Sequence, residues 1–184
     1  AELAGTTVTA VTSSGATNPA ALAAFGADRI LTTTLAATPF GMAQQLATIT
    51  AGSAGMVIAG TSLGRSIAPA LAALSGGALS TNTTAAPSNV SPVIVERGAF
   101  SSKGIETIEL ISGLPMVSFV PNSVGIQERP GEGLIENLGA TGTDLLSVTE
   151  QSIASGKVAL PEAEVVVSAG RGLKGPANWT MIEE

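Results

Sequence analysis

A short segment near the end of the sequence carries the residues best suited to hold an anionic cofactor. VVVSAGRGLKG (165–175) is an apolar, β-branched run that stops in a glycine turn containing Arg171 and Lys174. Glycines after a strand can bring backbone N–H groups close to an anionic or electron-rich ligand, and a guanidinium at such a turn can bind a pyrophosphate or an electron-rich ring. The alternative is a strand-to-helix turn whose glycines accept positive φ while Arg171 is solvated.

Two other patterns could do chemistry. TSLGR (61–65) follows an apolar run and precedes a helical pattern, so it could cradle a phosphate at a helix N-terminus or simply cap the helix. Glu128, Glu132 and Glu136 have the four-residue spacing of a cation site, but Pro130 and Gly131 interrupt any helix there. We therefore expect these acids to lie in a solvated linker, with no metal site.

The composition excludes many mechanisms. The 184 residues include no His and no Cys, which excludes Ser-His and Cys-His nucleophiles, His or thiolate metal sites, disulfides and thiol redox couples. The net charge of −6 argues against nucleic-acid or anionic-membrane partners. No apolar run approaches the roughly 18 residues that span a bilayer, so we expect a soluble intracellular chain with no membrane insertion.

The elements that must position these residues alternate along the first half of the chain. With 45% hydrophobic but only 3% aromatic residues, the core must be built from Ala, Val, Ile and Leu, as in layered α/β proteins. Periodicity predicts three parallel strands with helices on the sheet faces within 6–79, and Pro69 in the first turn of the last of these helices. The expected strands are 6–15, 30–34 and 54–64, and the expected helices are 18–30, 39–53 and 65–76.

The pattern changes after residue 90. Three close-set strands are expected at 91–100, 104–112 and 115–123, which suggests an antiparallel extension. The segments 127–139 and 149–164 are expected to form an exposed, acidic connector, and a new strand is expected to begin at Val165. The fold class is thus α/β and three-layered, with a mainly parallel sheet, an antiparallel extension and the start of a second α/β domain.

Two segments resemble a known family. GTSLGRSIAPALAALSGGAL (60–79) is similar to the Thr-Ser/Thr-x-Gly-Lys/Arg-x-x-x-Pro-x-x-Ala-x-x-Leu segment of the α subunit of electron transfer flavoprotein. VVVSAGRGLKGPANWTMIEE (165–184) resembles the strand and turn that open the flavin-binding domain of that subunit. The resemblance implies an N-terminal domain of nucleotide-binding-like (adenine nucleotide α hydrolase-like) topology at 1–148, short of its first strand and helix. It further implies a linker at 149–164 and the start of the FAD-binding domain at 165–184.

The resemblance also implies a function and a site. The family holds FAD and carries electrons from flavin dehydrogenases, such as the acyl-CoA dehydrogenases of fatty acid β-oxidation, to a membrane quinone reductase. It is a heterodimer with a β subunit, cytoplasmic in prokaryotes and in the mitochondrial matrix in eukaryotes, and it is a carrier, with no catalytic residues for substrate conversion. Arg171 is then expected to lie against the FAD, with Gly170 and Gly172 flanking it, whereas the segment 61–65 is expected to be only a capped helix start.

Other features leave a second function open. Where the family usually has a Tyr-x-Gly-Asn-like turn and a strand ending in Thr-Val-Arg, this chain has RGAFSSKG (97–104) and MVSFVPNSVG (116–125). The alternative is therefore a non-catalytic, nucleotide-binding-like interaction module that lacks a flavin domain. On either interpretation we expect the apolar face of 91–123 to be covered by a β-type subunit or by another copy, and residues 1–184 alone not to retain FAD.

Overall fold

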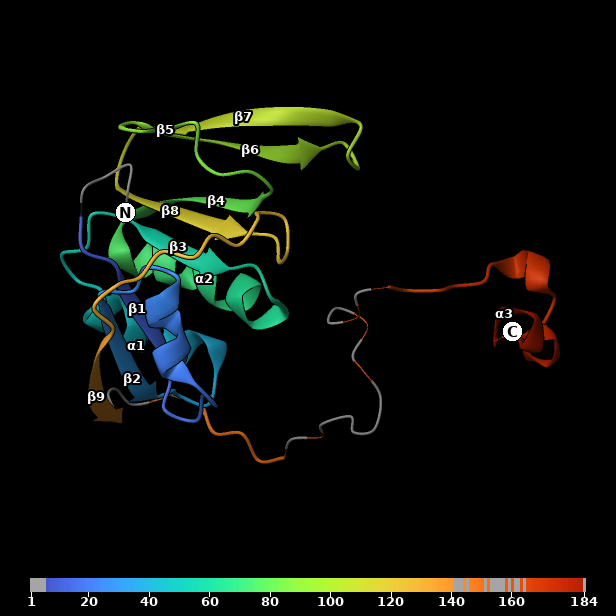
Figure 1. Cartoon of the computed structure of the whole chain (residues 1–184), viewed down its shortest axis with the longest axis horizontal. Coiled ribbons are helices and arrows are strands. Elements are labelled where there is room, and N and C mark those ends of the chain that lie inside the picture. Colours follow the sequence, from blue (N-terminus) through green and yellow to red (C-terminus); the bar gives the residue numbers. More distant parts are fainter. Residues whose placement is uncertain are drawn as a thin grey trace. The chain divides into compact units, whose positions relative to one another are not determined.

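Strands of the first half of the chain divide between two separate sheets (Figure 1). The structure, a computed structural model, describes residues 6–140, 144, 146–150, 152, 158, 160, 163 and 165–183. The chain divides into two compact units, Ala1–Val148 and Thr149–Glu184. The expected domain and linker boundaries stay predictions, because much of 149–164 lies outside the described residues.

The first sheet is small and entirely parallel. Its strand order is β1 (Thr9–Ser13), β2 (Arg29–Thr34), β9 (Leu134–Ala140). Ile30 and Leu31 of β2 are buried, whereas β9 is exposed at every position except Leu138. The prediction of an acidic connector at 127–139 was therefore wrong over its second half. A strand exposed on both faces has no apolar alternation from which to recognise it.

The second sheet combines parallel and antiparallel strands. In order it contains β3 (Met56–Ala59), β8 (Leu114–Phe119), β4 (Gly77–Thr83), β6 (Val93–Ala99) and β5 (Asn89–Val90), and β7 (Gly104–Leu110) also pairs with β6. The pairs β3–β8 and β8–β4 are parallel, and the pairs that β6 makes with β4, β5 and β7 are antiparallel. The fold class is confirmed as α/β with mostly parallel sheets and an antiparallel extension.

The strand order corrects two predictions. β3 does not join β1 and β2 in one sheet: it pairs with β8, which lies between β3 and β4. The segment 115–123 was expected in the antiparallel extension, but β8 is parallel to both of its neighbours. Met116, Val117 and Ser118 of β8 are buried, which suits a central parallel strand covered on both faces.

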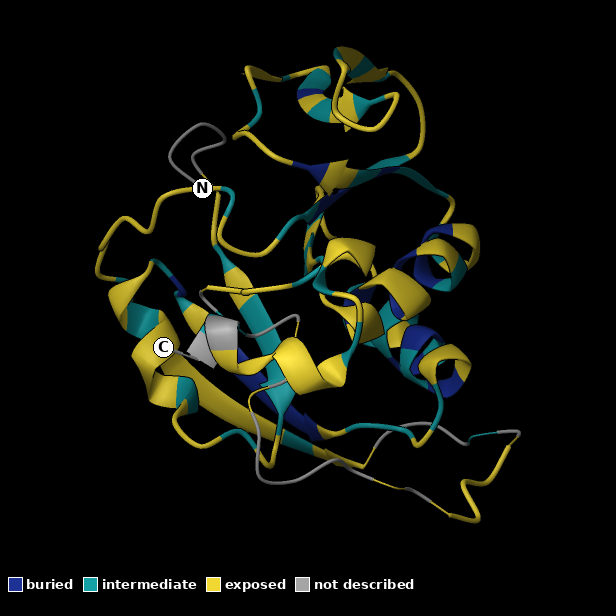
Figure 2. Ribbon diagram, turned by 90° about the vertical axis from the view of Figure 1, so that its right-hand side faces the viewer, coloured by how far each residue is buried: buried dark blue, intermediate teal, exposed yellow. Residues whose placement is uncertain are grey.

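Helix α2 (Ser62–Ser75) covers one face of the second sheet, and α1 (Pro39–Ile49) packs against α2. The apolar core lies between these helices and β3, β8 and β4 (Figures 1 and 2). The buried members of this core are small and aliphatic: Ala43, Ile67, Leu71, Ala72 and Met116. A core of this kind was predicted from the scarcity of aromatic residues.

Two helix predictions were wrong in detail. The expected helix 18–30 is only a 3-10 segment, η1 (Pro19–Ala24), since the carbonyls of Ala23 and Ala24 accept hydrogen bonds from Gly131 (2.7 Å) and Arg129 (2.8 Å). Pro69 was expected in a first helical turn, but α2 begins at Ser62 and places Pro69 in its interior. The helix begins early because Thr61 caps it.

The described elements of the C-terminal unit are short. These are η3 (Arg171–Leu173), η4 (Pro176–Asn178) and α3 (Thr180–Glu183). The strand expected from Val165 is absent: the described residues 165–170 have no strand conformation, and Val165, Val166 and Val167 are exposed. An apolar β-branched run needs neighbouring strands to pair with, and this unit has none among its described residues.

Candidate functional site

The glycine turn at 170–175 is held by local hydrogen bonds. The N–H of Leu173 donates to the carbonyl of Gly170 (3.0 Å), and the N–H of Lys174 donates to the carbonyl of Arg171 (3.1 Å). The side-chain amide of Asn178 donates to the carbonyl of Leu173 at 2.8 Å. This last bond connects η3 to η4, so the turn has a defined shape although it is exposed.

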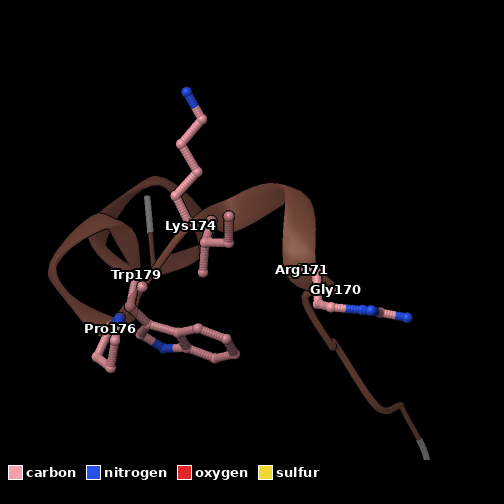
Figure 3. Close-up of a pocket in the computed structure, with 7 residues that line it drawn as sticks. Gly170, Arg171, Lys174, Pro176 and Trp179 are labelled. Carbon is pink, nitrogen blue, oxygen red and sulfur yellow. The ribbon is translucent and has the colours of Figure 1, made fainter.

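An open hollow of about 490 Å³ lies at this turn. Its lining combines two cations, an indole and small or apolar residues: Gly170, Arg171, Leu173, Lys174, Gly175, Pro176 and Trp179. Figure 3 shows the Trp179 ring beside Pro176, with the Arg171 and Lys174 side chains leaving the turn in different directions. An indole and apolar residues with two cations beside them suit an aromatic ligand that also carries negative charge.

The predicted site residues fall in and around this hollow. Arg171 and Gly170 line it, whereas Gly172 does not. The sequence prediction did not include Trp179 or Pro176, and it gave Lys174 no role. Trp179 is the one tryptophan of the sequence, and it lies eight residues after Arg171. This proximity in the sequence is the signal from which it could have been predicted.

Neither backbone conformation nor packing within the chain requires glycine at the three glycine positions of this turn. Gly170 has φ −89°, and a Cβ added at Gly170, Gly172 or Gly175 would meet no atom within 4 Å. The residue with left-handed backbone is Lys174, at φ 63°. The interpretation in which these glycines serve to accept positive φ therefore fails at Gly170 and Gly172, neither of which has positive φ. Missing side chains at this turn leave its backbone open to approach by another group.

The second glycine turn is structural. The Thr61 hydroxyl accepts a hydrogen bond from the N–H of Gly64 (3.1 Å) and caps α2. A Cβ at Gly64 would overlap the carbonyl oxygen of Ala59, and a Cβ at Gly60 would overlap that of Phe119. Both glycines thus allow close packing of backbone segments, and the helix-cap interpretation of 61–65 is the one that these contacts support.

The first turn of α1 contains a cluster that sequence reasoning missed. The Asp144 carboxylate accepts hydrogen bonds of 2.7 Å from both the N–H and the hydroxyl of Thr38. The Thr38 hydroxyl in turn caps the N–H of Gly41 at 3.2 Å. The Thr38 hydroxyl, followed by the N–H groups of Thr38, Leu146 and Ala37, lowers the pKa of Asp144 below its ordinary value of 3.8, and partial burial only opposes this. The carboxylate thus acts as an internal anion at a helix N-terminus.

The acidic series does not form a site. Glu136 lies on β9 and makes an ion pair of 3.0 Å with Arg29 of β2. Within the part of the chain that the structure describes, no group of three or more acidic side chains could hold a metal ion. Glu136 therefore joins two strands at the surface.

The hairpin formed by β6 and β7, together with Ile111 directly after β7, exposes apolar side chains. Phe100, Ser101 and Ser102 at its tip all have positive φ, between 51° and 64°. Phe100, Ile105 and Ile111 are more than three-quarters exposed. Arg97 and Glu106 pair across the two strands at 2.8 Å. The unusual RGAFSSKG segment thus presents an aromatic side chain to its surroundings.

Comparisons with known proteins identify the family. The model of the electron transfer flavoprotein domain matches residues 1–142. The chain is 28% identical over 130 residues to the electron transfer flavoprotein subunit alpha of Bacillus subtilis (strain 168), an alignment that covers 67% of this chain and 39% of that protein. The match thus spans well under half of the relative's length. None of the described helices has the length and hydropathy that crossing a bilayer requires. With a family model matching more than three-quarters of its residues, this α-subunit-like chain belongs to the electron transfer flavoprotein family.

Proposed function

We propose that this chain is part of the α subunit of an FAD-containing electron carrier. The observation that carries the proposal is the glycine turn at 170–175, whose open backbone and two cations border an apolar hollow. These residues fit a flavin nucleotide, which combines a planar ring with a diphosphate. Bound FAD supplies the electron-transfer chemistry, and the chain supplies binding and electrostatics.

Arg171 is the residue expected to act on the flavin ring. Its side chain is exposed and extends away from the turn (Figure 3), and among the described residues it makes no ion pair. A fixed positive charge beside the ring stabilises negative charge that develops there on reduction, and so raises the reduction potential. Gly170 and Gly172 flank this arginine and leave space for the ring to approach the backbone.

The turn alone is too small to retain FAD. One charge-assisted hydrogen bond contributes about 1.5–3 kcal/mol, whereas micromolar retention needs about 8 kcal/mol. The rest of the site would come from segments outside residues 1–184 and from a β-type subunit. The exposed Phe100, Ile105 and Ile111 of the hairpin supply an apolar surface for such a subunit.

In this role the chain converts no substrate of its own. It accepts electrons from flavin dehydrogenases and delivers them towards a quinone reductase, in the cytoplasm of a prokaryote or in a mitochondrial matrix. The second candidate is an interaction module without a flavin. The exposed Phe100 and Ile105, in and beside the RGAFSSKG segment that departs from the family pattern, favour this alternative.

Flavin content separates the two candidates. The natural gene product that carries this sequence, co-expressed with a β-type subunit, is expected to purify with FAD, and Arg171→Ala is expected to weaken FAD binding and lower the reduction potential. Residues 1–184 titrated with FAD are expected to show no tight binding. A flavin-free heterodimer would favour the interaction module, and an unchanged potential in the variant would remove Arg171 from the site.

A further inference from the structure

Lys174 occupies the position of the turn at which a lysine is least expected. It is the C-cap of η3 with φ 63° and ψ −16°, in the left-handed region that disfavours side chains with a Cβ. Gly170 and Gly172 lie in the same turn and do not have positive φ. A glycine at position 174 would relieve this strain, so the lysine carries a cost to the backbone. Strain of this kind is concentrated at functional positions.

The turn fixes where the Lys174 side chain begins. The N–H of Lys174 donates to the carbonyl of Arg171, and the Asn178 amide holds the carbonyl of Leu173 immediately before it. Lys174 and Arg171 are separated by one 3-10 turn, about 6 Å of axial rise. Figure 3 shows their side chains leaving this turn in different directions. They are therefore placed to meet two different groups of one ligand.

The two side chains differ in the ligand groups that they bind best. A guanidinium is planar and suits the face or edge of a ring, whereas an ammonium is a compact point charge that binds phosphate. We propose that Lys174 binds the diphosphate of the nucleotide while Arg171 contacts the ring, an inference that rests on the proposed FAD site. Lys174 is a binding residue in this scheme and does not tune the flavin.

The test compares Lys174→Gly with Lys174→Arg in the FAD-containing heterodimer. Lys174→Gly is expected to raise the dissociation constant for FAD about tenfold or more, the loss of one charge-assisted bond, and to reduce its dependence on salt. The reduction potential of the bound flavin is expected to stay at its wild-type value. Lys174→Arg keeps the charge and is expected to retain most of the affinity.

Lys174→Gly is expected to weaken FAD binding without destabilising the apoprotein. In the apoprotein, Lys174→Gly is expected to unfold at the same or a higher denaturant concentration than wild type, because glycine relieves the left-handed strain. Two controls come from outside the turn and the hairpin: Asn122→Gly removes a side chain at a similar φ of 62°, and Arg65→Ala removes a charge at an exposed position of α2. Both are expected to leave FAD binding unchanged.

The outcomes distinguish a failure of the Lys174 proposal from a failure of the proposed FAD site. A heterodimer that binds FAD equally well with Lys174→Gly overturns the role of Lys174 and leaves the carrier function intact. A changed potential in Lys174→Gly would place the lysine at the ring and overturn the division between the two cations. A heterodimer that binds no FAD in its wild-type form contradicts the proposed function and this inference with it.

Discussion

Both carboxylate oxygens of Asp144 accept hydrogen bonds from the single residue Thr38, one from its N–H and one from its hydroxyl, each at 2.7 Å. The two residues are 106 positions apart in the sequence. Because Thr38 is also the N-cap of α1, this contact attaches the segment after β9 to the start of a helix. It is the basis of the first two predictions.

The first prediction concerns acid stability. A carboxylate whose pKa is lower in the folded state contributes stability that is complete above its unfolded value, near 3.8, and is lost as the pH falls through the folded value. Wild type is therefore expected to lose stability more steeply than Asp144→Asn below about pH 4. Denaturant unfolding across this range measures the difference. In a Thr38→Ala background, which itself costs about 0.5–2 kcal/mol, the two curves should differ less, because the largest cause of the lowered pKa is removed while the N–H groups remain. Parallel curves with Thr38 present would contradict the prediction.

The second prediction is a change of sign at Gly41. Replacing a helical glycine with alanine normally stabilises by about 0.5–1 kcal/mol. Here the new Cβ would lie 2.6 Å from the Asp144 carboxylate, so Gly41→Ala is expected to destabilise wild type by about 1–3 kcal/mol. In an Asp144→Ala background the same change should stabilise. A double-mutant cycle of unfolding free energies checks this, and additive effects would rule out the contact.

The third prediction tests the packing interpretation of the 61–65 turn. Gly64→Ala is expected to destabilise by about 1–3 kcal/mol or more, because its Cβ would overlap the carbonyl oxygen of Ala59. Gly125→Ala is the matched control, since a Cβ there meets nothing within 4 Å. If both variants unfold at the same denaturant concentration, Gly64 is not needed for packing.

The fourth prediction concerns the buried amide of Gln45. Its side chain donates to the hydroxyl of Thr33 (3.1 Å) and the carbonyl of Thr34 (2.9 Å), and accepts from the N–H of Ala36 (3.1 Å). Gln45→Leu removes these three hydrogen bonds, although the Thr33 hydroxyl keeps its bond to the carbonyl of Gly139 (2.7 Å). The change is expected to cost about 1–3 kcal/mol. Gln44→Leu, at a less buried neighbouring position, should change the unfolding free energy much less. Equal effects would mean that the amide bonds add little.

Local sequence patterns predicted where helices and strands lie better than they predicted which strands pair with each other. The segments around β2, α1, β3 and β6 follow from periodicity and capping residues, because these signals depend on neighbours in the sequence. The position of β8 between β3 and β4 does not follow from such signals, since a buried apolar strand shows the same pattern whichever strands it pairs with. β9 was missed for the opposite reason, its exposure on both faces.

The candidate site shows the same division. Arg171 and Gly170 were identified from a motif, which a sequence displays directly. The left-handed backbone of Lys174 could not be read, since the turn contains three glycines that are more usual at such a φ. The Asp144 cluster depends on a contact across 106 residues, which no local pattern encodes.

The pairing of β9 with β2 determines the order in which the chain can fold as it is synthesised. Strands β3 to β8 of the second sheet all lie within residues 56–119, so that sheet can be complete while β9 has not yet been made. At about 5–20 residues per second, β9 follows β2 by about 5–20 s. Throughout that interval the edge of β2 is open. We expect this edge to be where a nascent chain is most exposed to chaperones and to mispairing.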